Sequence, residues 1–123
     1  MQLTSITLVD DDAPFREAVA RVLRGAGHAV ETCESGSQAW RVLQAEQPEV
    51  LITDLIMPEG DGVELISRVH SRFPAIRIIA VSGSGLMADL NLLSLARSLG
   101  AQIILDKPLD GEQLLNAVAE ILG

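Results

Sequence analysis

Carboxylates stand out in this sequence as residues that could do chemistry. Asp10, Asp11 and Asp12 follow the apolar run ITLV, and Asp54 follows the run VLIT. Two like charges about 4 Å apart repel by roughly 4 kcal/mol at an effective dielectric constant of about 20, so gathered carboxylates usually need a cation. Mg²⁺ is commonly bound through one or two carboxylates and keeps several waters. If these acids meet in the fold they predict a magnesium site; if they lie apart they form a solvated acidic turn.

A hydroxyl and an ammonium complete the set. Ser82 and Gly83 follow the run IIAV, and Lys107 follows IILD. Placed opposite a metal, these groups suit a tetrahedral anion, because phosphoryl transfer needs positioning, a metal that bridges oxygens and a cation for the negative charge. Asp54 then has two candidate roles, as a metal ligand and as a nucleophile that forms an acyl phosphate.

Short apolar runs that precede these residues alternate with amphipathic segments. The runs at 6–9, 28–33, 49–53, 76–81 and 102–105 read as strands, and a segment with helical spacing follows each of them. Strict alternation predicts an α/β fold with a parallel sheet and helices on both faces. In such sheets ligands bind outside the carboxyl ends of the strands, where the acids, the hydroxyl and the lysine all fall.

Composition narrows the class of protein. The chain has 123 residues and a net charge of −8, which fits a single domain over residues 1–123 and argues against binding to nucleic acid or to an anionic membrane surface. Cys33 is the single cysteine and is expected to be a buried strand residue. No leader or membrane-spanning run is evident, so we expect a soluble, cytoplasmic protein.

Four motifs together resemble one known family. LVDDD, LITDLIMPEGDG, IIAVSG and LDKP occur in this order, each at a predicted strand end. The sequence resembles a response-regulator receiver domain, the CheY-like phosphoprotein module of two-component signal transduction, over essentially its whole length. The resemblance implies a flavodoxin-like (βα)5 three-layer sandwich with a parallel five-stranded sheet of order 2-1-3-4-5.

The resemblance also implies how the chemistry is divided. Asp54 would accept a phosphoryl group from a phosphohistidine of a sensor histidine kinase or a histidine phosphotransfer protein. Mg²⁺ would be held by Asp11 directly, by Asp10 mainly through water, by Asp54, and by the backbone carbonyl of Ile56. The domain would catalyse only its own phosphorylation and dephosphorylation and would not be an enzyme otherwise.

The remaining site residues follow from the same resemblance. Lys107 would pair with the phosphoryl oxygens, Ser82 would donate a hydrogen bond to one of them, and the amide of Gly83 would lie beside it. The bond from Lys107 to Pro108 would be cis. Phosphorylation would change the surface of helix 4, strand 5 and helix 5 for an unknown downstream protein. A stand-alone regulator that is a monomer or weak dimer is expected.

Two departures from the family pattern bear on switching. Ile104 stands where the family often has an aromatic residue, so this chain lacks the ring that an aromatic rotamer relay needs. The segment between Ser82 and Lys107 is longer than usual. At about 100° per residue its helix places a leucine-rich face on the core, comprising Leu92, Leu93, Leu95, Ala96 and Leu99. Leu86, Met87 and Leu90 fall toward the polar side, as single exposed residues or as a partner patch.

Structural roles and other functions compete with this interpretation. Asp12, before Ala13 and Pro14, is expected to be a helix N-cap, and Asp106 to face solvent or neighbour Lys107. An aspartate-nucleophile phosphatase of the haloacid dehalogenase type would want an acid where Ile56 stands. A flavodoxin-like cofactor binder would need amide and hydroxyl donors in place of the acids after the first strand. A receiver-like scaffold without chemistry is hard to support with all the site residues present.

Overall fold

The computed structural model describes residues 4–55, 57, 62–83 and 90–123, the side chains of 90–93 excepted. Its sheet consists of five parallel strands in the order β2-β1-β3-β4-β5. The strands are β1 (Ser5–Val9), β2 (Ala29–Cys33), β3 (Val50–Asp54), β4 (Arg77–Ser82) and β5 (Ile103–Asp106). The predicted strands, the fold class and the strand order are therefore confirmed.

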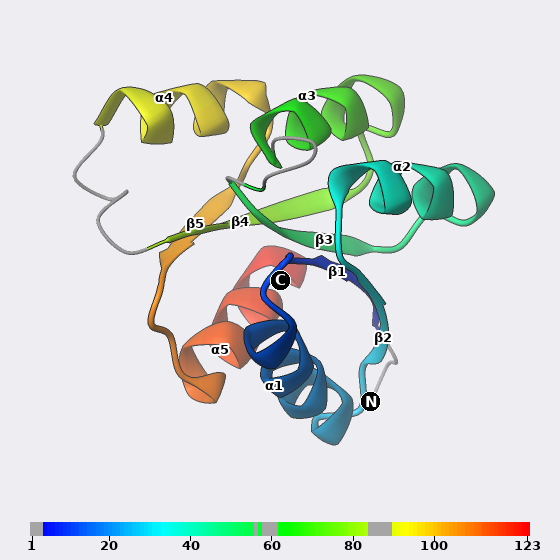
Figure 1. The fold of residues 1–123 in the computed structure, drawn as a ribbon, viewed down its shortest axis with the longest axis vertical. Helices are drawn as coiled ribbons and strands as arrows, with labels where there is room; N and C mark the ends of the chain where they lie inside the picture. The colour runs from blue at the N-terminus through cyan, green and yellow to red at the C-terminus, as the bar shows by residue number, and fades with distance from the viewer. Residues whose placement is uncertain (1–3, 56, 58–61, 84–89) are drawn as a thin grey trace.

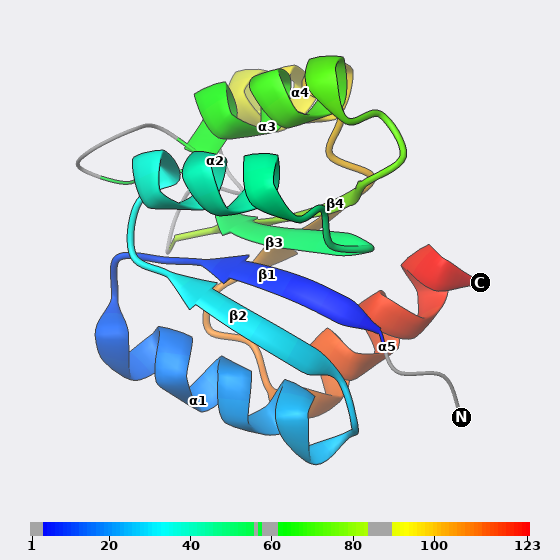
Figure 2. The same ribbon diagram turned by 90° about the vertical axis from the view of Figure 1, so that its right-hand side faces the viewer.

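Helices cover both faces of the sheet (Figures 1 and 2). The helices are α1 (Ala13–Gly25), α2 (Gly36–Ala45), α3 (Gly62–Arg72), α4 (Leu90–Leu99) and α5 (Gly111–Leu122). Helices α1 and α5 lie on one face, and α2, α3 and α4 on the other. Two separate apolar clusters fill the spaces between these layers, one on each side of the sheet. The result is the three-layer sandwich that strict alternation predicts.

Burial along the strands explains their sequences. Every residue of β3 is buried, and β1 and β4 are buried except at their first residues. Strands covered on both faces read as unbroken apolar runs, which is why these three were recognisable. Strand β2 lies at the sheet edge and alternates in exposure, but it ends on Cys33, which is 1% exposed as predicted.

Helix α1 begins directly after the acidic triplet because Asp12 caps it. The Asp12 carboxylate accepts a hydrogen bond from the backbone N–H of Phe15 at 3.3 Å, and Pro14 stands in the first turn. Such a cap satisfies one of the unpaired N–H groups at the helix start. The predicted N-cap role of Asp12 is confirmed.

Gly62 lets helix α3 start against the end of strand β3. A Cβ atom built on this glycine would overlap the backbone carbonyl oxygen of Asp54. The backbone N–H of Val63 donates to the carbonyl of Leu55 at 3.3 Å, so the two segments are directly bonded. Glycine is the one residue small enough for this approach, and the contact fixes the backbone around Asp54.

The core face predicted for helix α4 is wrong at one residue, Leu95. Ala96 is fully buried and Leu99 is half-buried, but Leu95 is 46% exposed. Helix α4 lies at one end of its layer and packs mainly against α3, and among its described side chains only Ala96 and Leu99 are covered. Leu95 lies about 100° around the helix from Ala96. Leu86 and Met87 lie outside the described residues, as do the side chains of Leu90, Leu92 and Leu93.

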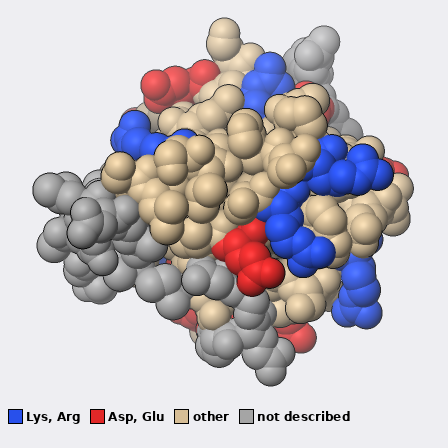
Figure 3. Space-filling view, turned by 90° about the horizontal axis from the view of Figure 1, so that it is seen from above, with Lys and Arg blue, Asp and Glu red and all other residues tan. Residues whose placement is uncertain are grey.

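Basic side chains gather on the outer surface of the α2–α4 layer, despite the net negative charge (Figure 3). The guanidinium of Arg68 lies 4.3 Å from the ring centroid of Trp40, and that of Arg72 lies 5.1 Å from the ring of Phe73. The two rings are themselves 5.9 Å apart. Through these contacts Trp40 of α2 packs against the end of α3, on the face of the sheet opposite to α1 and α5.

Candidate functional site

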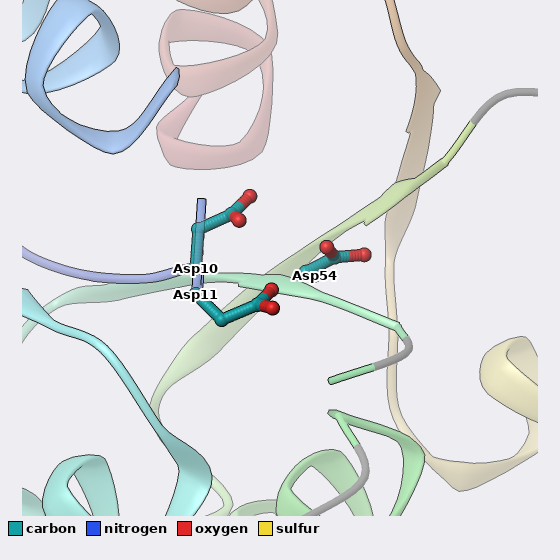
Figure 4. Close-up of side chains that lie close together, drawn as sticks. All are labelled: Asp10, Asp11 and Asp54. Atoms are coloured by element: carbon teal, nitrogen blue, oxygen red, sulfur yellow. The ribbon is translucent and has the colours of Figure 1, made fainter. Parts of the chain in front are cut away.

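Three carboxylates meet at the carboxyl end of the sheet (Figure 4). Asp10 and Asp11 directly follow β1, and Asp54 is the last residue of the neighbouring strand β3. One oxygen from each of the three lies within 4.8 Å of the others. Asp10 is 1% exposed and Asp54 is 7% exposed, whereas Asp11 is exposed. The predicted acidic cluster therefore forms, with one open side.

Lys107 approaches this cluster from the end of β5. Its Nζ atom lies 2.9 Å from Asp10 Oδ2 and 3.4 Å from Asp54 Oδ2. Burial lowers the pKa of Lys107, but the hydrogen bond to Asp10 and the charges of Asp10 and Asp54 outweigh burial, and the pKa lies above its usual value. The lysine is thus a fixed positive charge at neutral pH.

The two neighbouring acids are held differently. Asp10 is occupied at both oxygens, because Oδ1 accepts the backbone N–H of Asp12 at 2.9 Å and Oδ2 pairs with Lys107. The Arg16 guanidinium donates to the Asp10 backbone carbonyl at 2.7 Å and so holds the same turn. Asp11 has no hydrogen bond or ion pair among the described residues. Asp11 is therefore the acid with both oxygens available to a ligand.

Phe15 also contacts the lysine. Lys107 Nζ lies 4.1 Å from the Phe15 ring centroid, which is within cation–π range. The ring is half-buried and also lines a small cavity between α1 and α5, together with Leu109 and Leu114. Phe15 was not singled out as a site residue from the sequence. Its position five residues after Asp10, on the first turn of α1, was the available signal.

Ser82 is fully buried at the end of β4, and its hydroxyl is bonded to strand β5. The hydroxyl donates to Asp106 Oδ1 at 3.1 Å and, more distantly, to the Leu105 carbonyl at 3.4 Å. Asp106, expected to face solvent or to neighbour Lys107, is half-buried and accepts a hydrogen bond from Ser82, which the sequence did not predict. The two side chains meet because Ser82 and Asp106 are cross-strand partners in the β4–β5 register.

The other predicted site residues are placed as follows. Gly83 directly follows Ser82 and is half-buried. The peptide bond between Lys107 and Pro108 is cis, as the family resemblance implied. Ile56, the predicted carbonyl ligand, lies outside the described residues.

The donor set of this site suits a hard divalent cation. Three carboxylates gather where Lys107 and the Arg16 guanidinium are the cations, so negative charges outnumber positive ones. Each carboxylate pair repels by about 3–4 kcal/mol at an effective dielectric constant of about 20. Oxygen donors with room for water are what Mg²⁺ prefers. Lys107 beside Asp54 leaves a positive charge for an oxyanion at the same place.

A parallel five-stranded α/β fold with an acidic trio and a lysine at the strand ends is the arrangement of a receiver domain. The sequence model of the response regulator receiver domain matches residues 6–119. The chain belongs to this family and is a receiver domain of two-component response regulators.

Individual relatives agree with the family. Over 93% of its residues the chain is 31% identical to the photosynthetic apparatus regulatory protein RegA of Cereibacter sphaeroides. Over all of its residues it is 32% identical to the DNA-binding transcriptional regulator NtrC of Escherichia coli. It spans 60% of RegA and 26% of NtrC. Both relatives therefore extend beyond the region that this chain matches.

Solved structures share the fold. A CheY-like receiver domain protein from Methanospirillum hungatei superposes with a TM-score of 0.92 and 25% identity over 98% of this chain and 94% of that one. The chemotaxis response regulator CheY4 of Vibrio cholerae gives a TM-score of 0.86 and 26% identity over 98% and 99% of the two chains.

Proposed function

We propose that this domain is a phosphorylation switch in which Asp54 is the phosphoacceptor. The observation that carries the proposal is the position of Asp54, whose carboxylate lies beside the acidic pair and 3.4 Å from Lys107 Nζ in a chain of the receiver family. A carboxylate oxygen of Asp54 attacks the phosphorus of a phosphohistidine, and the P–N bond to the donor imidazole breaks. The imidazole nitrogen takes a proton from solvent, and an acyl phosphate remains on Asp54.

The acidic cluster supports a role for Mg²⁺. Asp11 and Asp54 would hold the ion directly, Asp10 would act mainly through water, and the carbonyl of Ile56 would complete the protein ligands. When bound, the ion would offset the charge of the carboxylates and of the phosphoryl oxygens. Occupation of both Asp10 oxygens by Asp12 and Lys107 agrees with the indirect role of Asp10.

Lys107 and Ser82 would contact the oxygens of the phosphoryl group on Asp54. The lysine ammonium is already 3.4 Å from Asp54 Oδ2, so a phosphoryl group bonded to Asp54 would develop its charge next to a cation. Ser82 and the amide of Gly83 stand at the end of β4, the strand beside β3. They would supply a hydroxyl and an N–H donor to the same oxygens.

Signalling would then depend on partners. The phosphodonor would be a sensor histidine kinase or a histidine phosphotransfer protein, and a downstream protein would read the surface of α4, β5 and α5. We expect no direct contact with nucleic acid, a cytoplasmic location, and a monomer or weak dimer. Among the described residues no helix is long and apolar enough to cross a membrane.

A phosphatase with turnover on a separate substrate remains the alternative. That chemistry would need a second acid close after the nucleophile, and the residue two places beyond Asp54 is Ile56. We therefore propose that the domain catalyses only its own phosphorylation and dephosphorylation. Sustained hydrolysis of a small phosphate ester such as p-nitrophenyl phosphate would favour the phosphatase instead.

The direct test is phosphoryl transfer from a small donor. Incubation with Mg²⁺ and acetyl phosphate should add the mass of one phosphoryl group to the wild-type chain, read by intact-mass spectrometry. Asp54→Asn should gain nothing, and omission of Mg²⁺ should abolish the gain. As a matched control, Glu120→Gln replaces an exposed acid in the last turn of α5 and should be phosphorylated normally. Equal labelling of Asp54→Asn and wild type would overturn the assignment.

A further inference from the structure

The Ser82 hydroxyl already donates a hydrogen bond to Asp106, and the proposed function requires the same hydroxyl to donate to the phosphoryl group. A serine hydroxyl has one hydrogen and can donate one strong hydrogen bond at a time. In this structure the hydroxyl oxygen of the fully buried Ser82 lies 3.1 Å from Asp106 Oδ1, a shorter hydrogen bond than the one of 3.4 Å to the Leu105 carbonyl. The same hydrogen cannot be given to an oxygen of a phosphoryl group on Asp54 without leaving Asp106.

Several features make the bond between Ser82 and Asp106 well defined. The two residues are register partners in adjacent parallel strands, so their backbones are fixed with respect to each other. The backbone N–H of Lys107 also donates to the Ser82 carbonyl at 2.9 Å. Among the described residues, Ser82 is the one hydrogen-bond donor to the Asp106 carboxylate. Hydrogen bonds to charged acceptors are also stronger than those between neutral groups.

We propose that Asp106 is a positioning residue that holds the Ser82 hydroxyl in the unphosphorylated state and competes with the phosphoryl group for it. This inference rests on the proposed function, since the competitor is the phosphoryl group on Asp54. When Ser82 turns to that group, Asp106 loses its donor. The half-buried Asp106 carboxylate, next to Lys107 at the end of β5, then takes another position or another hydrogen-bond partner.

This competition supplies a switch that does not need an aromatic residue. Ile104 occupies the β5 position where the family often has an aromatic ring, and here it is half-buried against the core on the α2–α4 side. Ser82 and Asp106 connect the end of β4 directly to the end of β5. A change at Ser82 therefore reaches the β5 surface through a carboxylate instead of through a ring. A ligand shifts such a two-state equilibrium by its differential affinity for the two arrangements.

The test uses beryllium trifluoride with Mg²⁺, a stable stand-in for a phosphoryl group on a carboxylate, titrated by calorimetry. Asp106→Ala should bind the anion about five- to tenfold more tightly than wild type, because Ser82 no longer leaves a charged acceptor. Asp106→Asn keeps an acceptor oxygen without the charge and should gain less. Glu120→Gln, which removes an exposed acid at the far end of α5, should leave the affinity unchanged.

A double-mutant cycle separates competition for the hydroxyl from simple charge repulsion. In a Ser82→Ala background, Asp106→Ala should give no further gain, because there is no hydroxyl to release. The same gain in both backgrounds, or no gain in either, overturns the inference. In addition, the carboxyl ¹³C resonance of Asp106 should shift when beryllium trifluoride binds to wild type and should stay in place in Ser82→Ala. The dispersion of the other resonances in the same NMR spectra would show whether each variant is folded.

Failure of the proposed function is distinguishable from failure of this inference. Wild type that neither binds beryllium trifluoride nor accepts a phosphoryl group from acetyl phosphate contradicts the role of Asp54, and the inference falls with it. Wild type that does both, but shows no energetic coupling between Ser82 and Asp106, retains the proposed function and loses only the competition.

Discussion

The ammonium of Lys107 lies 4.1 Å from the ring centroid of Phe15 while it pairs with Asp10 and Asp54. The lysine is therefore held both by carboxylates at the site and by an aromatic ring on the first turn of α1. Cation–π contacts contribute about 0.5–1 kcal/mol at exposed positions and more when desolvated. Phe15 also packs between α1 and α5, so it connects the position of the lysine to the contact between these helices.

Replacing this ring should loosen the lysine without removing its charge. We expect Phe15→Leu to slow phosphorylation by acetyl phosphate several-fold and to cost about 1 kcal/mol of unfolding free energy. Phe73→Leu is the matched control, because Phe73 also faces a cation, Arg72, but lies at the end of α3. It should lose stability and phosphorylate at the wild-type rate. Equal rates for all three proteins would mean that the ring does not position Lys107.

The acids of the triplet should respond unequally to substitution. Asp11→Ala removes the exposed carboxylate of the cluster and should abolish Mg²⁺-dependent phosphorylation in the intact-mass assay. Asp12→Ala removes the α1 cap and should cost about 1 kcal/mol in urea unfolding while leaving phosphorylation intact. Equal loss of phosphorylation in the two variants would show that Asp12 also serves the site.

Gly62 should tolerate no side chain. Gly62→Ala would place a methyl group on the Asp54 carbonyl oxygen, and because that atom is backbone, α3 or the end of β3 must move. We expect a loss of more than about 2 kcal/mol in urea unfolding, together with slower phosphorylation. Gly25→Ala is the control, since a Cβ there meets no atom within 4 Å. A Gly62→Ala protein of wild-type stability would contradict the close approach.

The sheet could be predicted from the sequence because strands that are buried on both faces consist almost entirely of apolar residues. Strands β1, β3 and β4 are covered on both faces and appear as unbroken apolar runs, each bounded by polar or proline-containing segments. The acidic cluster followed from the same pattern, because residues that end neighbouring parallel strands must lie at one edge. This reasoning correctly brought Asp10, Asp11, Asp54 and Lys107 together.

Contacts that depend on side-chain direction could not be predicted in this way. The bond from Ser82 to Asp106 depends on register and rotamer, since either residue alone reads as an ordinary polar strand end. Leu95 looked like a core residue because helical spacing does not reveal how wide a stripe the neighbouring layer covers. Only the structure shows that the Phe15 ring contacts Lys107.

Cys33 gives the domain a pH dependence at the alkaline end. Burial, with a smaller contribution from the charge of Glu31, raises the pKa of this thiol from 9.0 to about 11. Between these values the unfolded thiol ionises while the folded one keeps its proton, so the folded state binds more protons and stability falls as pH rises. The contribution is fully present below pH 9 and is lost by about pH 11, an effect on the order of 2 kcal/mol.

Urea unfolding across this range measures the effect. Wild type should lose stability steadily from pH 9 to 11, and Cys33→Ala should show a shallower decline from a lower starting value, because the substitution leaves a small cavity. Any loss shared by both proteins above about pH 10 would include Lys107, whose pKa is also raised and whose ion pairs disappear when it deprotonates. The native thiol should also react slowly with a disulfide reagent at pH 8 and rapidly in urea. Parallel stability curves for the two proteins would show that the Cys33 thiol titrates alike in the folded and unfolded states.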